Sequence, residues 1–297
     1  MMACDLCGIY SATETEFGKG PFAGVAEQFT HFGTLQLDGS EVSDPANQYL
    51  DSSILQIFGG YNFTKRFGVQ FNLPLIYRSF RRPEGFEIDE GHESGLGDVS
   101  LTGKLVLYRH QEEGIAAAAT LMGGIKFPTG NSDRLAEELN EVEVPGAPPS
   151  GVHGHDLTLG SGSYDGVIGG TVYVQLKRAF LSATAQYAIR TEGDFDYRFA
   201  NDLVWSGGPG ALLILNDDYT LSLQANVSGE HKALDEFQGE SVEDTGVTSV
   251  YIGPELLLTW GEELNVELGA DIPVSIDNTS LQIVPDYRIR VAATWRF

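Results

Sequence analysis

The stretch "VPDYRIRVAATWRF" (284–297) ends the sequence, and its side chains alternate between apolar and polar residues. Successive side chains of an extended strand point to opposite faces, so this stretch would present two different faces. One face would carry the apolar row Tyr287, Ile289, Val291, Ala293, Trp295 and Phe297. The other face would carry Asp286, Arg288, Arg290, Thr294 and Arg296. A soluble sheet could use such a strand once, so the fold depends on whether the rest of the chain repeats the pattern.

The pattern recurs along the whole chain, most clearly in "YTLSLQANVS" (219–228). Alternating or continuously apolar segments predict twelve strands, at 23–37, 49–62, 66–79, 97–109, 114–127, 164–177, 179–190, 201–215, 219–229, 247–260, 263–276 and 284–297. Their connections alternate in length. Short turns are expected at 63–65, 110–113, 177–178, 216–218 and 261–262. Longer loops are expected at 38–48, 80–96, 128–163, 191–200, 230–246 and 277–283.

This layout predicts an all-β protein, a transmembrane antiparallel up-and-down β-barrel of about 12 strands. In a bilayer every backbone amide must be paired, so a sheet can span it only when the sheet is closed. Each strand then needs about 9–11 residues, and the predicted segments are that long or slightly longer. A soluble sandwich or lipocalin-like barrel would bury its apolar face inward and gives no reason for strands this uniformly long. The final strand would close the sheet, and Phe297 resembles the terminal aromatic signal of outer-membrane barrels.

The charge of the chain is strongly acidic, with 42 Asp and Glu against 18 Lys and Arg and a formal net charge of −24. Phosphate binding needs a basic footprint, so we exclude nucleic acid as a partner. Three segments, 84–93, 133–156 and 231–246, together hold 16 of the acidic residues, so the acidity belongs to particular loops. The start "MMACDLCG" lacks the basic region and apolar core of a secretion signal, so an exported protein would have a mature or re-engineered start.

Three motifs in the middle of the chain carry a family resemblance. They are "GLGDVSL" (95–101), "GIKFPTG" (124–130) and "LGSGSYDGVIGG" (159–170). In order and spacing they resemble motifs of the outer-membrane "transporter" family that is associated with the meta-pathway (MetA-pathway) of phenol degradation. The core of the resemblance covers 95–190, and the barrel layout extends it over the chain. The resemblance implies an outer-membrane channel more firmly than it implies any particular substrate.

The polar rows are the best candidates for function, because they would face the lumen if the apolar rows face lipid. The basic candidates are Arg78, Lys104, Lys126, Lys177, Arg190, Arg288, Arg290 and Arg296. The acidic candidates are Asp98, Asp165, Glu255, Glu267 and Asp271. Unpaired charges in a narrow barrel are costly, so these residues could form an interior network that fixes the barrel. They could instead form a ladder that guides solutes, since rings of charge set selectivity in pores.

The N-terminal segment 1–20 is expected to be periplasmic, ahead of a barrel at 21–297, and it contains the sequence Cys4-x-x-Cys7. Covalent haem attachment needs a His directly after the second Cys, and this chain has Gly8 there. A local disulfide is the commonest outcome in an oxidising periplasm. A redox or metal-handoff role and lipidation of Cys4 stay open as alternatives.

The sequence "HGHD" offers His153, His155 and Asp156 in the longest loop, beside a run of carboxylates. Such a set could bind a transition metal or calcium, although acidic loops are more often only solvated. No other cofactor is expected. We find no G-x-S-x-G or comparable nucleophile motif, so we do not expect an enzyme.

These observations together predict a protein of the bacterial outer membrane with both termini in the periplasm and with lipid and lipopolysaccharide around it. The predicted function is passive passage of small solutes, with aromatic or hydrophobic compounds among the candidates. The alternative is a structural barrel sheath that holds a periplasmic or multihaem redox partner across the membrane. A lumen of twelve strands is easily filled by loops, so the two hypotheses differ in whether the bore is open.

Overall fold

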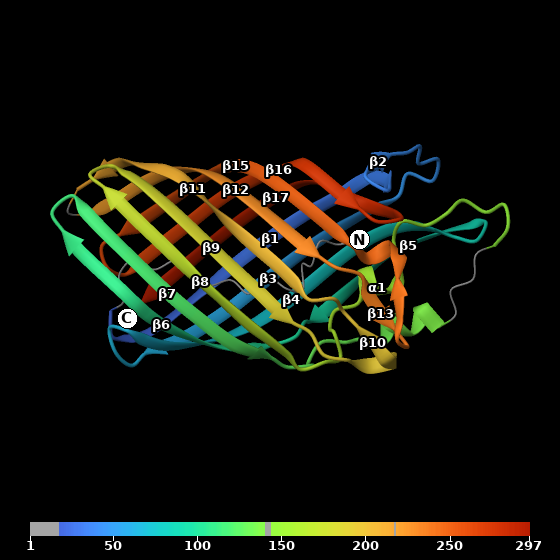
Figure 1. Cartoon of the computed structure of the whole chain (residues 1–297), viewed down its shortest axis with the longest axis horizontal. Helices are drawn as coiled ribbons and strands as arrows, with labels where there is room; N and C mark the ends of the chain where they lie inside the picture. Colours follow the sequence, from blue (N-terminus) through green and yellow to red (C-terminus); the bar gives the residue numbers. More distant parts are fainter. Residues whose placement is uncertain (1–17, 140–143, 217) are drawn as a thin grey trace.

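The structure is a computed structural model, and it describes residues 18–139, 144–216 and 218–297. Its main element is a sheet of twelve long antiparallel strands that is rolled into a barrel (Figure 1). These strands are β1 (Gly20–Leu37), β3 (Tyr49–Asn62), β4 (Phe67–Glu84), β6 (Ser100–Glu112), β7 (Ile115–Lys126), β8 (Asp165–Leu176), β9 (Ala179–Ile189), β11 (Asp202–Leu215), β12 (Tyr219–Lys232), β15 (Val247–Trp260), β16 (Leu264–Asn278) and β17 (Leu281–Arg296). The predicted fold class and strand number are confirmed.

The barrel is closed by its first and last strands. β17 pairs antiparallel with β1 from Phe22–Arg296 to Leu37–Leu281, with a bulge around Phe32. Each barrel strand therefore has a neighbour on both sides over at least part of its length, which is what a sheet needs in a bilayer where water cannot pair its edges. The sequence at 284–297 supplies this closing strand, as its alternation predicts.

The two faces of the wall differ in the way that the alternating sequence requires. On β17, Tyr287, Ile289 and Val291 are exposed on the outside of the barrel. Ala292 and Thr294 from the same strand are buried inside. Other strands repeat this arrangement, with exposed apolar side chains outside and buried polar ones inside, so the apolar surface lies where lipid would contact it.

The connection predicted as a loop at 80–96 is instead a β-hairpin, and this prediction is wrong. β4 continues to Glu84, and β5 (Glu87–Leu96) pairs with it from Glu84–Glu87 to Leu75–Leu96. Gly85 turns the chain with a φ of +61°, a conformation that glycine adopts without steric cost. The hairpin projects past the start of β6 at the long-loop end of the barrel (Figure 1).

Smaller elements lie in the long loops. The short strand β2 (Ser40–Glu41) folds back on β1, and β10 (Tyr197–Arg198), β13 (Asp235–Phe237) and β14 (Glu240–Val242) form a separate small sheet. The helical turns are η1 (Asp133–Leu139), α1 (Gly154–Leu157), η2 (Asp194–Asp196) and η3 (Glu243–Thr245). Within the described ranges, no helix is long and apolar enough to cross a membrane.

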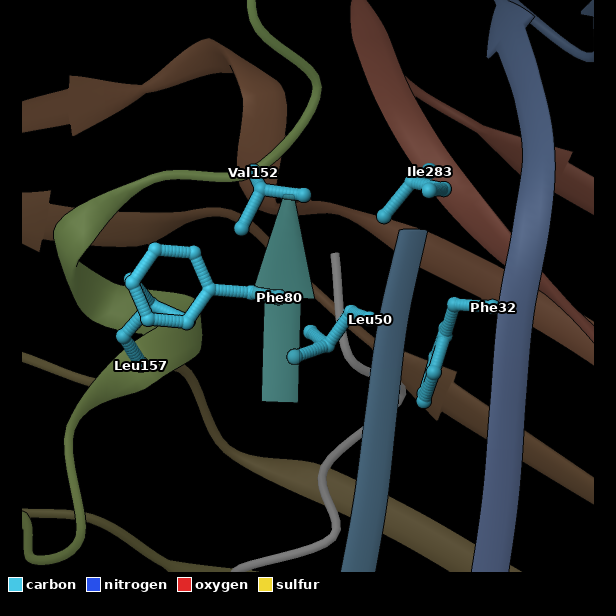
Figure 2. Packing of buried hydrophobic residues seen from close by; sticks show 6 residues of the cluster. All are labelled: Phe32, Leu50, Phe80, Val152, Leu157 and Ile283. Carbon is cyan, nitrogen blue, oxygen red and sulfur yellow. The ribbon is translucent and has the colours of Figure 1, made fainter. Parts of the chain in front are cut away.

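The loop between β7 and β8 does not extend into solvent over its whole length, because part of it folds into the barrel mouth. Val152 and Leu157 from this loop pack against four buried side chains of the wall, as Figure 2 shows. These four are Phe32 from β1, Leu50 from β3, Phe80 from β4 and Ile283 from β17. An apolar core thus forms inside the long-loop end of the barrel. We refer to residues 144–163 as the inserted loop.

The wall is interrupted on one side. Pairing of β16 with β17 runs from Leu264–Trp295 to Asp271–Arg288, and the described residues form no further pair between these strands. Beyond that point β16 stays paired only with β15 and β17 only with β1. Pro273 and Pro285 lie in the two separated stretches and have no N–H to donate. The long-loop half of the wall is therefore divided between these strands.

The outward position of Val291 can be tested by placing a charge there. Val291→Arg should lower the free energy of unfolding by about 2–4 kcal/mol, because a charge on the lipid face near the bilayer midplane loses its hydration. Gln175→Arg is the matched control, since Gln175 lines the water-facing side of β8. Denaturant unfolding in lipid vesicles measures both. Equal destabilisation by the two substitutions would contradict the assignment of faces.

Candidate functional site in the barrel lumen

The short-turn end of the lumen is an open vestibule with a volume of about 470 Å³. Its wall consists largely of hydroxyl and amide side chains, among them Gln175, Ser182, Gln224 and Asn226. Ser182 donates a hydrogen bond to the Gln224 side chain at 2.9 Å. Glu267, predicted to face the lumen, lines this vestibule. Water can therefore hydrate the wall of the vestibule, whereas the outer face of the barrel is apolar.

A second cavity of about 180 Å³ lies next to the vestibule, with Thr184 and Ser206 bordering both. We refer to it as the middle cavity. Arg290 borders it and contacts Asp271 at 2.9 Å and Glu255 at 3.2 Å. A Cβ atom at Gly269 would lie 3.2 Å from the Arg290 guanidinium, so the absence of a side chain there leaves the arginine room against the wall.

Arg288 makes similar side-chain contacts along the same wall. Its guanidinium lies 4.1 Å from the ring centre of Tyr251, a cation–π distance, and 3.5 Å from Glu230. Both arginines thus reach from β17 across neighbouring strands to carboxylates. The predicted lumen residues Glu255, Asp271, Arg288 and Arg290 come together here. Their role in selectivity stays a prediction.

The sequence reasoning missed two members of this group, Glu230 and Tyr251. The predicted strand ended at 229, and β12 continues to Lys232. The signal was present, since Glu230 and Lys232 continue the alternating polar row of that strand and are both buried.

Lys177 was predicted to face the lumen, and the structure places it elsewhere. It lies exposed in the tight turn between β8 and β9 with a φ of +54°, so the prediction that it points into the lumen is wrong.

The three motifs of the sequence meet in one buried ion network near the long-loop end. Lys126 contacts Asp98 at 3.0 Å and Asp165 at 2.9 Å. Arg190 continues the network from Asp165 at 2.7 Å to Asp202 at 3.2 Å. These five side chains are almost fully buried. Buried charges need partners on every side, and here they alternate in sign.

Asp98 also ties the loop segments to this network. It accepts hydrogen bonds from the backbone N–H groups of Thr129, Gly130 and Ser161. These donors come from both ends of the β7–β8 loop. The motif residues thus anchor the two stems of that loop to the start of β6, which explains why glycine and small hydroxyl residues cluster at these strand ends.

Arg78, on β4, binds the backbone of the inserted loop. It is 1% exposed and donates hydrogen bonds to the carbonyl oxygens of Asp156, at 2.7 Å, and of Thr158. On the other side, the Ile283 N–H donates to the Gly151 carbonyl at 3.0 Å, on the stretch of β17 that lacks β16 as a neighbour. A Cβ atom at Gly151 would lie 3.0 Å from the Ile283 backbone nitrogen and would also meet the Leu35 side chain. The close approach therefore requires glycine. Two predicted lumen residues remain: Lys104 is buried on β6, and Arg296 lines the vestibule.

His153 and His155 stack with ring centres 5.6 Å apart, but each contacts different carboxylates. His155 Nδ1 lies 3.0 Å from Glu138, and its Nε2 lies 3.6 Å from Asp156. His153 Nε2 lies 3.1 Å from Asp244. Among the described residues, no three His, Cys, Asp or Glu side chains are grouped so that they could hold a metal ion. Metal binding by His153, His155 and Asp156 stays a prediction, and Cys4 and Cys7 lie outside the described residues.

Burial of His155 by itself lowers its pKa, but the charges of Asp156 and Glu138 reverse this effect and raise the pKa to about 10. His155 is therefore a buried imidazolium at neutral pH. It connects η1, which carries Glu138, to α1. Apolar packing, hydrogen bonds to its backbone and the charged contacts of His155 thus all hold the inserted loop in place.

No family model matches this sequence, and no curated protein matches it. Among solved structures the chain is similar to the COG4313 outer membrane channel from Pseudomonas putida F1, with a TM-score of 0.63 and 16% identity over 97% of this chain and 100% of the other. The chain has an outer-membrane β-barrel fold. It is also similar to the beta domain of the Bordetella autotransporter BrkA, with a TM-score of 0.52 and 10% identity over 94% and 100% of the chains. The resemblance drawn from the three motifs is confirmed as a likeness of fold.

The raised pKa of His155 predicts that the inserted loop loosens in alkali. A group whose pKa rises on folding, here from 6.5 to about 10, stabilises the folded state fully below pH 6.5. That contribution falls as pH rises and is lost above pH 10. Hydrogen exchange of 144–163 should therefore accelerate between pH 7 and 10.5 relative to the intrinsic amide rate, and His155→Gln should remove this pH dependence. His110→Gln, at the exposed rim, is the control. The same pH response in wild type and His155→Gln would contradict the assignment.

Proposed function

We propose that the protein is a passive channel for small solutes in the bacterial outer membrane, where lipid and lipopolysaccharide surround its apolar outer face. The observation that carries this proposal is the polar lumen inside an apolar wall. The vestibule and the middle cavity share Thr184 and Ser206, so they follow each other along the barrel axis. The fold shared with an outer membrane channel supports the same conclusion.

The inserted loop is the element that controls passage in this proposal. It fills the long-loop end of the lumen with Val152 and Leu157, which pack on the wall. A solute can cross only when the loop moves or leaves a side path. The separated stretches of β16 and β17 offer such a path for an apolar solute, since on that side the described residues cover β17 through loop contacts such as Gly151–Ile283.

We propose further that the solutes are aromatic or hydrophobic compounds of about one ring. The middle cavity has a volume of about 180 Å³, and an apolar cavity of about 150 Å³ in another protein holds benzene. Ile54 on β3 and Val204 on β11 supply apolar contacts in the middle cavity, and Phe32, Leu50 and Phe80 are buried under the inserted loop. A one-ring solute would find apolar contacts along this route.

Flux through vesicles tests the channel. Arg78→Gln removes the hydrogen bonds that Arg78 donates to Asp156 and Thr158, so the inserted loop should open more often. We expect benzyl alcohol to enter proteoliposomes several times faster through Arg78→Gln than through wild type, after subtraction of entry into protein-free vesicles. Arg81→Gln is the control, because Arg81 pairs with the exposed Glu90 on the hairpin. No protein-dependent flux in either variant would contradict a channel and favour the sheath.

In the sheath hypothesis, a periplasmic or multihaem redox protein would occupy the lumen. Such a partner would have to displace the inserted loop, with its buried contacts at Phe80 and Ile283. The chain already fills the mouth with its own residues, so the observations favour the channel.

The orientation that we propose places both termini in the periplasm and the β7–β8 loop outside the cell. Gly146 is a suitable reporter site, since it has a φ of +87° and no atom lies within 4 Å of a Cβ built there. A protease site inserted at Gly146 should be cut on intact cells. A matching site inserted after Gly261, in a short turn, should be cut only after the outer membrane is broken. The reverse pattern would contradict the orientation.

A further inference from the structure

We propose that the outer face of β1 and β3 carries a hydrated track, along which water and lipid headgroups reach from the membrane surface toward the bilayer midplane. The residues of this track, which we call the polar strip, are Glu27, His31, Thr34, Asp51, Ser53 and Asp286. The proposal goes beyond passage through the lumen, because it concerns the face that contacts lipid. It rests only on the proposed membrane location.

The register of the strands places the polar strip on the outside of the barrel. His31 pairs with Tyr287 on β17 and with Asp51 on β3. Directly paired residues of an antiparallel sheet share a face, and Tyr287 is exposed on the outside. The His31 ring stacks on Tyr287, with ring centres 5.4 Å apart. Glu27 precedes His31 by four residues, an even number, so it points to the same face.

A β-bulge brings Asp286 to this face as well. The pairing of β17 with β1 shifts register at His31 and leaves Asp286 opposite no residue of β1. Such bulges redirect a side chain. Asp286 Oδ2 lies 3.8 Å from His31 Nε2, and Oδ1 accepts a hydrogen bond from Thr34 at 2.7 Å. Arg288, two residues away, is the last residue of β17 that pairs with β16. The polar strip therefore ends beside the separated stretches of β16 and β17.

The other end of the polar strip lies near the middle of the apolar band. Glu27 follows Pro21 by six residues, and Pro21 pairs with the exposed Tyr61 at the short-turn end. Six residues of a strand tilted by about 40° rise about 15 Å, and the apolar band of such barrels is about 25 Å tall. Ser53 donates a hydrogen bond to Glu27 at 2.5 Å. An ionisable side chain is thus aimed at lipid close to the midplane.

Hydrocarbon chains cannot satisfy these side chains. His31 and Asp51 contact each other at 2.6 Å, yet their side chains are 31% and 34% exposed, and that of Asp286 is 36% exposed. A carboxylate has room for about four hydrogen bonds, so the contacts within the strip use only part of this capacity. Ionisable groups in lipid are costly, and water defects and local thinning of the bilayer reduce that cost. The exposed part of the strip therefore attracts water and headgroups.

Three other strands show an ordinary lipid face. The outward rows of β8, β12 and β15 present exposed apolar side chains, among them Val172, Val174, Leu223, Ile252 and Leu256. Lipid chains cover such rows without loss of hydration. Thinning of the bilayer along the polar strip is therefore local. It lies next to the separated stretches of β16 and β17, where it lowers the barrier for the polar group of a lipid or solute that enters sideways.

The accessibility of a nitroxide spin label tests the hydrated track in the full chain, reconstituted in lipid vesicles after both cysteines are replaced by serine. The label is attached to Ser53→Cys or to the control Ile252→Cys. The two sites match, because Ser53 lies eight residues from the exposed Tyr61 on its strand and Ile252 lies eight residues from the exposed Trp260. We expect collisions with a water-soluble nickel chelate, relative to collisions with oxygen, to be several times more frequent at position 53 than at position 252.

Replacement of the ionisable group nearest the midplane should dry the track. Glu27→Leu should lower the nickel accessibility at position 53 toward the value at position 252. Glu240→Leu, exposed on β14 in the long loops, is the control and should leave it unchanged. Folding of each variant is checked by its compact migration in unheated detergent gels. If Glu27→Leu does not fold, His31→Leu serves instead and should lower the accessibility in part.

Equal and low accessibility at positions 53 and 252 would overturn the track and leave the membrane location in place. Equal and high accessibility would contradict the membrane location itself. Dipolar broadening between labels at position 53 that persists on dilution of the protein in lipid would also overturn the track, because a second copy of the chain would then cover the strip. The flux of benzyl alcohol is independent of these results, so a dry strip with flux leaves the channel in place.

Discussion

Pairing of β17 with β1 is the interaction on which the rest of this structure depends. It joins the ends of the sheet over the whole length of β1, from Phe22–Arg296 to Leu37–Leu281. Without it, two strands would leave unpaired N–H and C=O groups in a medium that offers no water, at a cost of several kcal/mol for each group. Closure makes an outer face for lipid and an inner face for water, and it determines which row of each strand is exposed to which medium.

Closure also explains why the charged residues gather inside. Asp98, Lys126, Asp165, Arg190 and Asp202 alternate in sign around the long-loop end. Their desolvation is offset only because each charge has an opposite neighbour. The network ties the stems of the β7–β8 loop to the wall, while Arg78 holds the middle of that loop. The same charges that stabilise the barrel therefore also hold the inserted loop in its mouth.

The lumen mixes charged and neutral side chains around the middle cavity. Arg288 and Arg290 lie against carboxylates on β12, β15 and β16, and neutral residues are interleaved with them, since Val204 pairs with Glu230 and Gln28 pairs with Arg290. The proposed one-ring solute would meet both kinds of side chain. A lumen with charge on every side would select ions, and one with none would not orient a solute.

The amino-acid sequence by itself determined the barrel, because an alternation of period two is a local property that each strand shows on its own. The alternating row at 284–297 gave the closing strand, and the three motifs marked strand ends. The hairpin at Glu84–Leu96, the inserted loop and the exposed position of Lys177 were decided only by the tertiary structure. They depend on which distant residues meet, as Val152 meets Phe32 and Ile283, and no local pattern records such contacts. The partner of Asp271 was likewise decided by register, because it takes the pairing of β16 with β17 to bring Arg290 beside it.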